Sequence, residues 1–433
     1  MTSLDSACTS FTRLTSRRQH LGEMMRGATG GLVGLSGLAE PSIAGALKKQ
    51  ARRVLMVYLS GGISQFESWD PKRATTTGGP FHSIASSVPG THVGELIPHT
   101  AQQLHHLTLI RSLSTPEVEH GRGYYYVHTG HSGSPSANWE DPAVGSMIAK
   151  RMADEKDPLP YVHITPEGGS GFGKGDASIL GARFGPVNLV DGKLPANTSR
   201  PKGLSASGER RRDSLRDSAN RRFLKRRART AETEAYSYSF EQAARLMERK
   251  GIFSTDRATA RDRERYGDHE FGRHCLMARR LIEQGLLFVK VTHTNYDSHC
   301  ENFSFHVQKL AEFDRPFAAL VGDLAERGLL EDTLLIVTSE FGRTPSINYN
   351  YGRDHYGKCW SMALGGCGIA RGAVHGKSDP RGWEATENQV NLAQVFHTYF
   401  AALGLDSHKE FVVDGRPVAV ADKSEQAIAE ILR

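Results

Sequence analysis

The sequence is poor in cysteine and has no long apolar run. Its 433 residues include only five cysteines, and none of them form a C-x-x-C pair. This density is too low for a disulfide scaffold, and without paired cysteines a thiolate metal site is not expected. No uninterrupted run approaches the roughly 20 apolar residues that a membrane-spanning helix needs. The rest of the composition, with 38% hydrophobic residues, 24% charged residues and 45 glycines, is typical of a globular, loop-rich protein with a large core.

The net charge of +6 comes largely from one basic segment at about 205–265. Arg210, Arg211 and Arg212 lie there, but Glu209 and Asp213 flank them. Because acidic residues are interleaved with the basic ones, we interpret the segment as a solvated helical excursion and predict no nucleic-acid partner.

The N-terminus has the order of an export signal. Arg17 and Arg18 precede a weakly apolar, glycine-rich stretch at 27–39, and the triplet Ala44-Gly45-Ala46 follows. The alternative is an amphipathic helix, but glycines at this density make a poor one. We therefore predict a twin-arginine signal over residues 1–46 and a periplasmic or extracellular location. The rest, 47–433, is predicted to form one domain.

Four short, nearly continuous apolar runs predict buried strands at 53–59, 107–113, 286–291 and 333–338. Between the last two, the segment 303–327 has apolar residues at a spacing of three to four, starting at Val307, and is followed by Gly328. This pattern predicts a helix, so strand, helix and strand form a right-handed parallel crossover of an α/β sheet.

Polar clusters follow the last two strands. In an open parallel sheet, ligands bind beyond the carboxyl ends of the strands, so the clusters are expected to meet in one pocket. Carboxylates with imidazoles suit Zn, Mn or another divalent ion. Arg343 and Arg353 in these clusters could hold an anionic substrate. Alternatively, they could form an ion-pair network with Glu340 and Asp354. The residues are Asp297, His299, Glu340, Arg343, Arg353, Asp354 and His355.

The loop after the first strand adds further candidates. Ser64 follows Gly61 and Gly62 and is the best candidate nucleophile, although serines in such loops often only form turns. Glu67 and Asp70 could complete a metal shell, or Asp70 could cap the turn. His120, after the second strand, is a candidate metal ligand or acid.

Several motifs resemble one family. They are S-G-G-I-S-Q-F-E-S-W-D-P-K from Ser60, Y-D-S-H from Tyr296, E-F-G-R-T-P from Glu340 and G-R-D-H from Gly352. They are similar to the secreted sulfatase-like family called domain of unknown function 1501, in the alkaline phosphatase superfamily. The resemblance implies a doubly wound, mostly parallel sheet with helices on both faces, and a divalent metal centre (Zn, Mn or Ca). It also implies hydrolysis of sulfate or phosphate esters.

The sequence also departs from that superfamily. Ser60 stands where a ligand aspartate is usual, and Phe341 stands where a histidine is usual. No C-x-[PA]-x-R motif exists, so a formylglycine nucleophile is not expected. Two hypotheses remain. One is a metal-dependent hydrolase with an anionic small-molecule or glycan ester as substrate. The other is a degenerate, non-catalytic member that binds an anionic glycan or a cell-surface partner.

Overall fold

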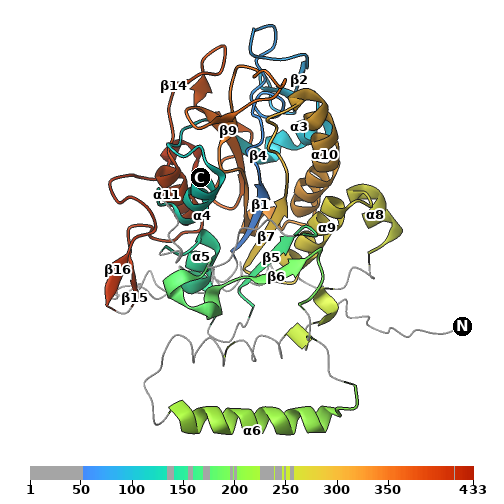
Figure 1. The fold of residues 1–433 in the computed structure, drawn as a ribbon, viewed down its shortest axis with the longest axis vertical. Coiled ribbons are helices and arrows are strands. Elements are labelled where there is room, and N and C mark those ends of the chain that lie inside the picture. The colour runs from blue at the N-terminus through green and yellow to red at the C-terminus, as the bar shows by residue number, and fades with distance from the viewer. Residues whose placement is uncertain are drawn as a thin grey trace, which may run out of the picture. The chain divides into compact units, whose positions relative to one another are not determined.

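The computed structural model describes residues 52–133, 141–154, 159–168, 176–195, 198, 202–224, 238, 246–247, 250–253, 258–413 and 415–433 (Figure 1). Within these ranges no helix is both long enough and apolar enough to cross a membrane. The predicted export signal, 1–46, lies outside the described residues and stays a prediction.

One eight-stranded sheet forms the centre of the structure. Seven of its strands run in the same direction, because only β11 pairs antiparallel with its two neighbours. The predicted, mostly parallel α/β sheet is thereby confirmed. In spatial order the strands are β12 (Ala373–His375), β4 (Leu107–Leu113), β11 (Trp360–Gly366), β8 (Thr333–Thr338), β1 (Arg53–Leu59), β7 (Phe288–His293), β5 (Tyr161–Thr165) and β6 (Val187–Val190).

Both faces of the sheet are covered by helices, which makes the fold doubly wound (Figure 1). Along β1, Val54 and Met56 pack into one core, while Leu55 and Val57 pack into the other, since successive side chains of a strand point to opposite faces. The helices on the first face are α4 (His120–Thr129), α5 (Val144–Met152) and α11 (Leu392–Ala402). Those on the second are α3 (Pro98–Gln103), α8 (Ala260–Tyr266), α9 (Glu270–Glu283) and α10 (Asn302–Glu326).

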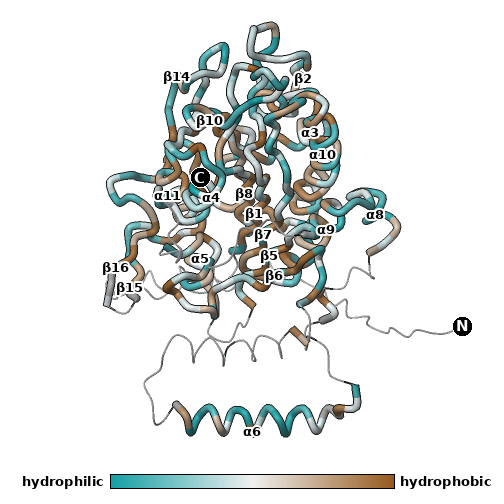
Figure 2. The backbone as a smooth tube through the Cα atoms, in the orientation of Figure 1, coloured by the Kyte–Doolittle hydropathy of each residue, from teal (hydrophilic) through white to brown (hydrophobic). Residues whose placement is uncertain are grey.

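Hydropathy follows this architecture. Figure 2 shows hydrophobic residues along the central strands and a largely hydrophilic α6 (Ala206–Leu224), which belongs to the predicted basic excursion. Described side chains of α6 are exposed or half-buried, so its arginines face solvent.

Short antiparallel pairs of strands form separate small sheets outside the central one. They are β2 (Ser83–Ala85) with β3 (His92–Gly94), β9 (Gly342–Arg343) with β10 (His355–Tyr356), β13 (Lys377–Ser378) with β14 (Ala385–Glu387), and β15 (Phe411–Val413) with β16 (Arg416–Val418). The pair β9 and β10 places Arg343 opposite His355.

The predicted elements agree with most of the observed ones. The strands β1, β4 and β8 have the predicted bounds, β7 begins two residues later than predicted, and α10 begins one residue earlier. The prediction for Val307 was wrong: its side chain is 46% exposed on α10 instead of lying on the buried face.

The loop after β1 requires glycine at position 61. Gly61 has a φ of 112°, and a Cβ built there would lie 2.5 Å from the backbone nitrogen of Tyr296. Gly90 also has a positive φ, of 77°, but a Cβ there would meet nothing within 4 Å.

We therefore expect Gly61→Ala to lower the free energy of unfolding by about 3 kcal/mol, through backbone strain and overpacking together. The matched control Gly90→Ala carries only the backbone strain, about 1 kcal/mol. Urea unfolding monitored by circular dichroism measures both. Equal losses in the two variants would contradict the close approach of the two loops.

Candidate metal centre

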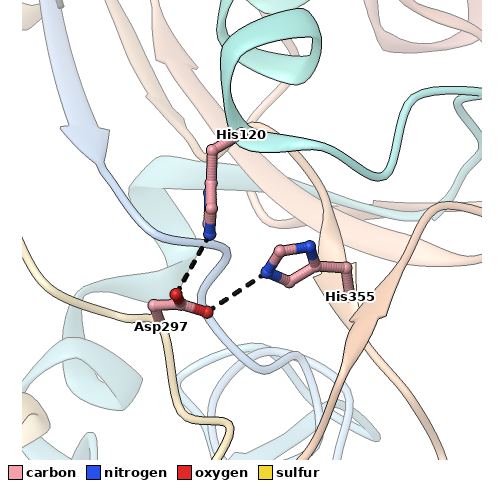
Figure 3. Close-up of side chains that lie close together, drawn as sticks. All are labelled: His120, Asp297 and His355. Atoms are coloured by element: carbon pink, nitrogen blue, oxygen red, sulfur yellow. Dashed lines mark hydrogen bonds and ion pairs between the residues drawn. The ribbon is translucent and has the colours of Figure 1, made fainter.

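Loops at the carboxyl ends of β1, β4, β7 and β8 meet above the sheet. His120 is the first residue of α4, and Glu119 caps that helix by accepting hydrogen bonds from the N–H groups of Gly121 and Arg122. Asp297 lies in the loop after β7, and His355 lies on β10. Figure 3 shows the rings of His120 and His355 directed at the Asp297 carboxylate between them.

The Asp297 carboxylate is the common point of this site. The Nε2 atom of His120 lies 3.2 Å from its Oδ2. The Nε2 atoms of His299 and His355 lie 3.1 Å and 3.2 Å from its Oδ1. Arg343 donates to the same Oδ1 from 2.7 Å. One ligand atom each of His120, Asp297 and His355 lies within 4.8 Å of the others, which is close enough for one metal ion to bind all three.

The Nδ1 atom of each histidine is held by an oxygen that acts as an acceptor. The partners are Glu340 Oε1 at 2.8 Å from His120, Asp354 Oδ1 at 2.8 Å from His299, and the Val118 carbonyl at 2.7 Å from His355. A carbonyl or an ionised carboxylate only accepts, so each Nδ1 carries a proton. In the neutral imidazole, Nε2 then has the lone pair, the arrangement common among metal-binding histidines.

The electrostatics fit a cation at this point. Burial opposes protonation of His120, but hydrogen bonds to Asp297 and Glu340 prevail and raise its pKa to about 9. Burial raises the pKa of Asp297, yet hydrogen bonds from His120, His355 and Arg343 bring it far below the usual range. The Nε2 atoms of His299 and His355 are also only 3.0 Å apart. Lone pairs so close to one another and to a carboxylate require a proton or a metal ion between them. A set of imidazoles and one carboxylate favours Zn or Mn over Ca.

Glu340 and Asp354 lie behind the histidines. Glu340 is buried and accepts hydrogen bonds from the Tyr58 hydroxyl and the Gly61 N–H, each at 2.8 Å, in addition to His120. Asp354 accepts from Asn348 at 2.9 Å in addition to His299. Both carboxylates therefore orient histidines, whereas the sequence suggested them as metal ligands.

A family model described as "Protein of unknown function (DUF1501)" matches residues 51–432. The chain belongs to the DUF1501 family. The resemblance seen in its motifs is thus confirmed at the level of the family. No match is found among curated proteins.

Solved structures with a similar arrangement include sulfatase PsFucS1 from Pseudoalteromonas sp., with 15% identity, a TM-score of 0.40, and coverage of 85% of this chain and 72% of that one. A protein of the alkaline phosphatase superfamily from Vibrio parahaemolyticus has 11% identity, a TM-score of 0.40, and coverage of 82% and 67%. The periplasmic domain of EcEptC from Escherichia coli, in complex with Zn, has 11% identity, a TM-score of 0.38, and coverage of 82% and 83%. At these TM-scores no conclusion about the activity of this DUF1501 protein follows.

Both candidate arginines of this DUF1501 chain are fully buried. Arg343 donates to the carbonyls of Gly61, Gly62 and Arg353 and to Asp297. Arg353 forms an ion pair with the equally buried Glu67 at 3.0 Å and also donates to backbone carbonyls. In these positions the guanidinium groups hold loops together, and neither one points to solvent where an anion would bind.

The contacts described for Ser64 and Asp70 are with residues other than Asp297. The Ser64 side chain is buried beside Glu67 and His306, and the Ser64 N–H donates to the ring of His306 at 3.4 Å. Asp70 pairs with Lys72 at 2.9 Å and accepts a hydrogen bond from Ser378. The structure does not bring four of the sequence-predicted side chains to the candidate metal site, namely Ser64, Glu67, Asp70 and Arg353. It does bring the others there.

Two further residues, Tyr58 and Ser339, help to build the site but were not predicted from the sequence. Tyr58 appeared as part of an apolar strand, although a hydroxyl in such a run is a signal for a buried polar partner. Ser339 Oγ accepts hydrogen bonds from the N–H groups of Gly62 and Ile63 at 3.1 and 3.2 Å, and so fixes the loop after β1.

The buried pair of Glu67 and Arg353 can be tested apart from the centre. Glu67→Gln leaves the Arg353 charge uncompensated, so we expect the free energy of unfolding to fall by about 3–5 kcal/mol. Bound metal is expected to remain at the wild-type level. Urea unfolding and metal analysis measure the two effects. The control Glu387→Gln removes an exposed partner of Lys377 and is expected to cost at most about 1 kcal/mol. A folded Glu67→Gln variant without bound metal would instead indicate that Glu67 is a metal ligand.

Proposed function

We propose that this protein is a metal-dependent hydrolase of sulfate or phosphate esters. One divalent ion, Zn or Mn, would be held by the Nε2 atoms of His120 and His355 and by the Asp297 carboxylate, whose ligand atoms lie within 4.8 Å of one another. His299 would lie beside this set and leave a position open to water and substrate. The observation that carries this proposal is the convergence of three Nε2 atoms on one carboxylate, while each Nδ1 is held by an acceptor oxygen.

The exposure of the site supports catalysis over a structural role. The side chains of His299 and Asp297 are 41% and 38% exposed. Structural zinc sites are closed by four protein ligands, whereas catalytic sites are reached by water and substrate. When bound, a divalent ion polarises an ester oxygen and lowers the pKa of a bound water molecule.

The remaining residues would maintain the reactive arrangement. Arg343 holds Asp297 in its ionised form, Glu340 orients His120, and Asp354 orients His299. Ser64 is not the nucleophile in this proposal, because its hydroxyl lies beside Glu67 instead of at Asp297. Water is the nucleophile that this arrangement favours.

The alternative, a non-catalytic binder of anionic glycans, receives less support. Such a site would need exposed cationic groups, and Arg343 and Arg353 are both buried with carboxylate or carbonyl partners. A site of three imidazoles and a carboxylate also goes beyond what anion binding requires.

The proposal predicts that His355→Ala loses one equivalent of bound metal and at least about 100-fold of any hydrolysis of p-nitrophenyl sulfate or phosphate. Plasma mass spectrometry of the purified protein and a colorimetric assay measure these losses. The matched control His82→Ala removes an exposed histidine and is expected to change neither. Full metal content and activity in folded His355→Ala would refute the proposal.

We also propose that residues 1–46 are a twin-arginine signal that exports residues 47–433 as one folded domain. The support is the order of Arg17-Arg18, a glycine-rich apolar stretch and Ala44-Gly45-Ala46.

For this signal, replacing Arg17 and Arg18 together by lysine keeps the positive charge and is expected to leave the full-length protein inside the cytoplasm. Cell fractionation with immunoblotting measures the distribution. Replacing Arg52 and Arg53 by lysine is the matched control and is expected to leave export unchanged. Undiminished export of the Arg17/Arg18 variant would rule out the twin-arginine route.

A further inference from the structure

A second group of possible ligands lies at the edge of the sheet. Asp191 directly follows β6, and Glu270 and His274 lie one turn apart on α9, on the same face of that helix. One ligand atom from each lies within 4.8 Å of the others. This cluster is separate from the Asp297 centre, because β5 lies between β6 and β7, the strand that leads to Asp297.

The ring of His274 is the buried member of this cluster. Its side chain is only 2% exposed, and among the described residues its Nε2 has no hydrogen-bond partner. The atom faces Asp191 Oδ1 at 3.5 Å. A buried polar nitrogen without a hydrogen bond costs about 1–3 kcal/mol, so such a group calls for an explanation. A cation shared by the nitrogen and the carboxylate would supply one.

Backbone hydrogen bonds hold the main chain of Asp191 and the carboxylate of Glu270. Asp191 sits in a tight turn with a φ of 50°, a conformation that aspartate tolerates better than most residues, and its N–H donates to the Thr165 carbonyl at 2.8 Å. Glu270 Oε1 accepts a hydrogen bond from the Glu167 N–H at 2.7 Å. The turn and the helix thus hold the backbone of Asp191 and the carboxylate of Glu270 at neighbouring positions.

Two cationic side chains form ion pairs with the Asp191 carboxylate. The Nζ atom of Lys193 lies 2.8 Å from Oδ2, and Arg273 lies 3.4 Å from Oδ1. Their side chains are 72% and 46% exposed. Exposed ion pairs contribute only about 0–1 kcal/mol, so a metal ion would displace these groups at little cost.

We propose that Asp191, Glu270 and His274 form a second divalent-cation site, for Zn²⁺ or Mn²⁺, that links the edge strand β6 to α9. Two carboxylates with one imidazole are a donor set that these ions accept. The site stabilises the edge of the sheet and takes no part in the proposed hydrolysis.

The experiment uses the full chain with His299→Ala and His355→Ala as background, so that the Asp297 centre is removed. Zn²⁺ and Mn²⁺ are each titrated by calorimetry. We expect one equivalent of one of these ions to bind this background and to raise its melting temperature. Asp191→Asn, which keeps the shape of the turn, is expected to weaken the binding at least tenfold. Lys193→Gln, which removes the competing ammonium group, is expected to strengthen it.

The inference is overturned if the background binds neither ion, if folded Asp191→Asn binds as tightly as the background, or if Lys193→Gln binds no more tightly. Should Asp191→Asn fail to fold, Lys193→Gln still decides, because its exposed side chain can change without disturbing the core. Failure of the ester-hydrolase proposal would leave these results unchanged, since the background already lacks the Asp297 centre.

Discussion

Three hydrogen bonds from imidazole Nδ1 atoms to fixed oxygens orient the histidine rings of the Asp297 centre. Their acceptors come from separate parts of the chain: Glu340 follows β8, Val118 precedes α4, and Asp354 precedes β10. Because each acceptor is held by the scaffold, the rings are oriented before any ligand arrives. Such preorganisation removes the entropy cost of ordering ligand side chains on binding. The orientation of the Nε2 atoms is thus a property of the fold, and the proposed binding of a metal ion rests on it.

Arginines have a structural role around this centre. Arg343 joins the loop after β1 to the loop after β7, and Arg353 joins Glu67 to the segment before β10. The planar guanidinium suits this task, since it donates to several carbonyls at once. In sequence, the same residues resemble a clamp for sulfate or phosphate. Since both are occupied, the negative charge of an ester substrate would have to be met mainly by a metal ion, which makes the proposed activity strictly dependent on that ion.

The sequence predicted the central strands and the convergence of their loops, but it did not predict the partners within the loops. Buried parallel strands are continuous apolar runs, so β1, β4 and β8 could be located to the residue. Residues after such strands must share one edge of the sheet, which brought Asp297 and His355 together. By contrast, the contact of Ser64 with His306 joins distant segments without any periodic signal. The Val118 carbonyl leaves no trace in side-chain chemistry, and β6, with only four residues, is too short to give a continuous apolar run.

The position of β1 in the sheet has a consequence for the order of folding. This strand is the first of the sheet along the chain, yet Val54 pairs with Phe288 and Leu334. Loops of this length must close before the middle of the sheet gains its ladder, so folding is expected to be slow and dominated by distant contacts. A chain still emerging from the ribosome holds β1 without a partner until β7 and β8 have been synthesised. During that interval an unpaired apolar strand is open to wrong pairings, and protection by a chaperone would be most valuable then.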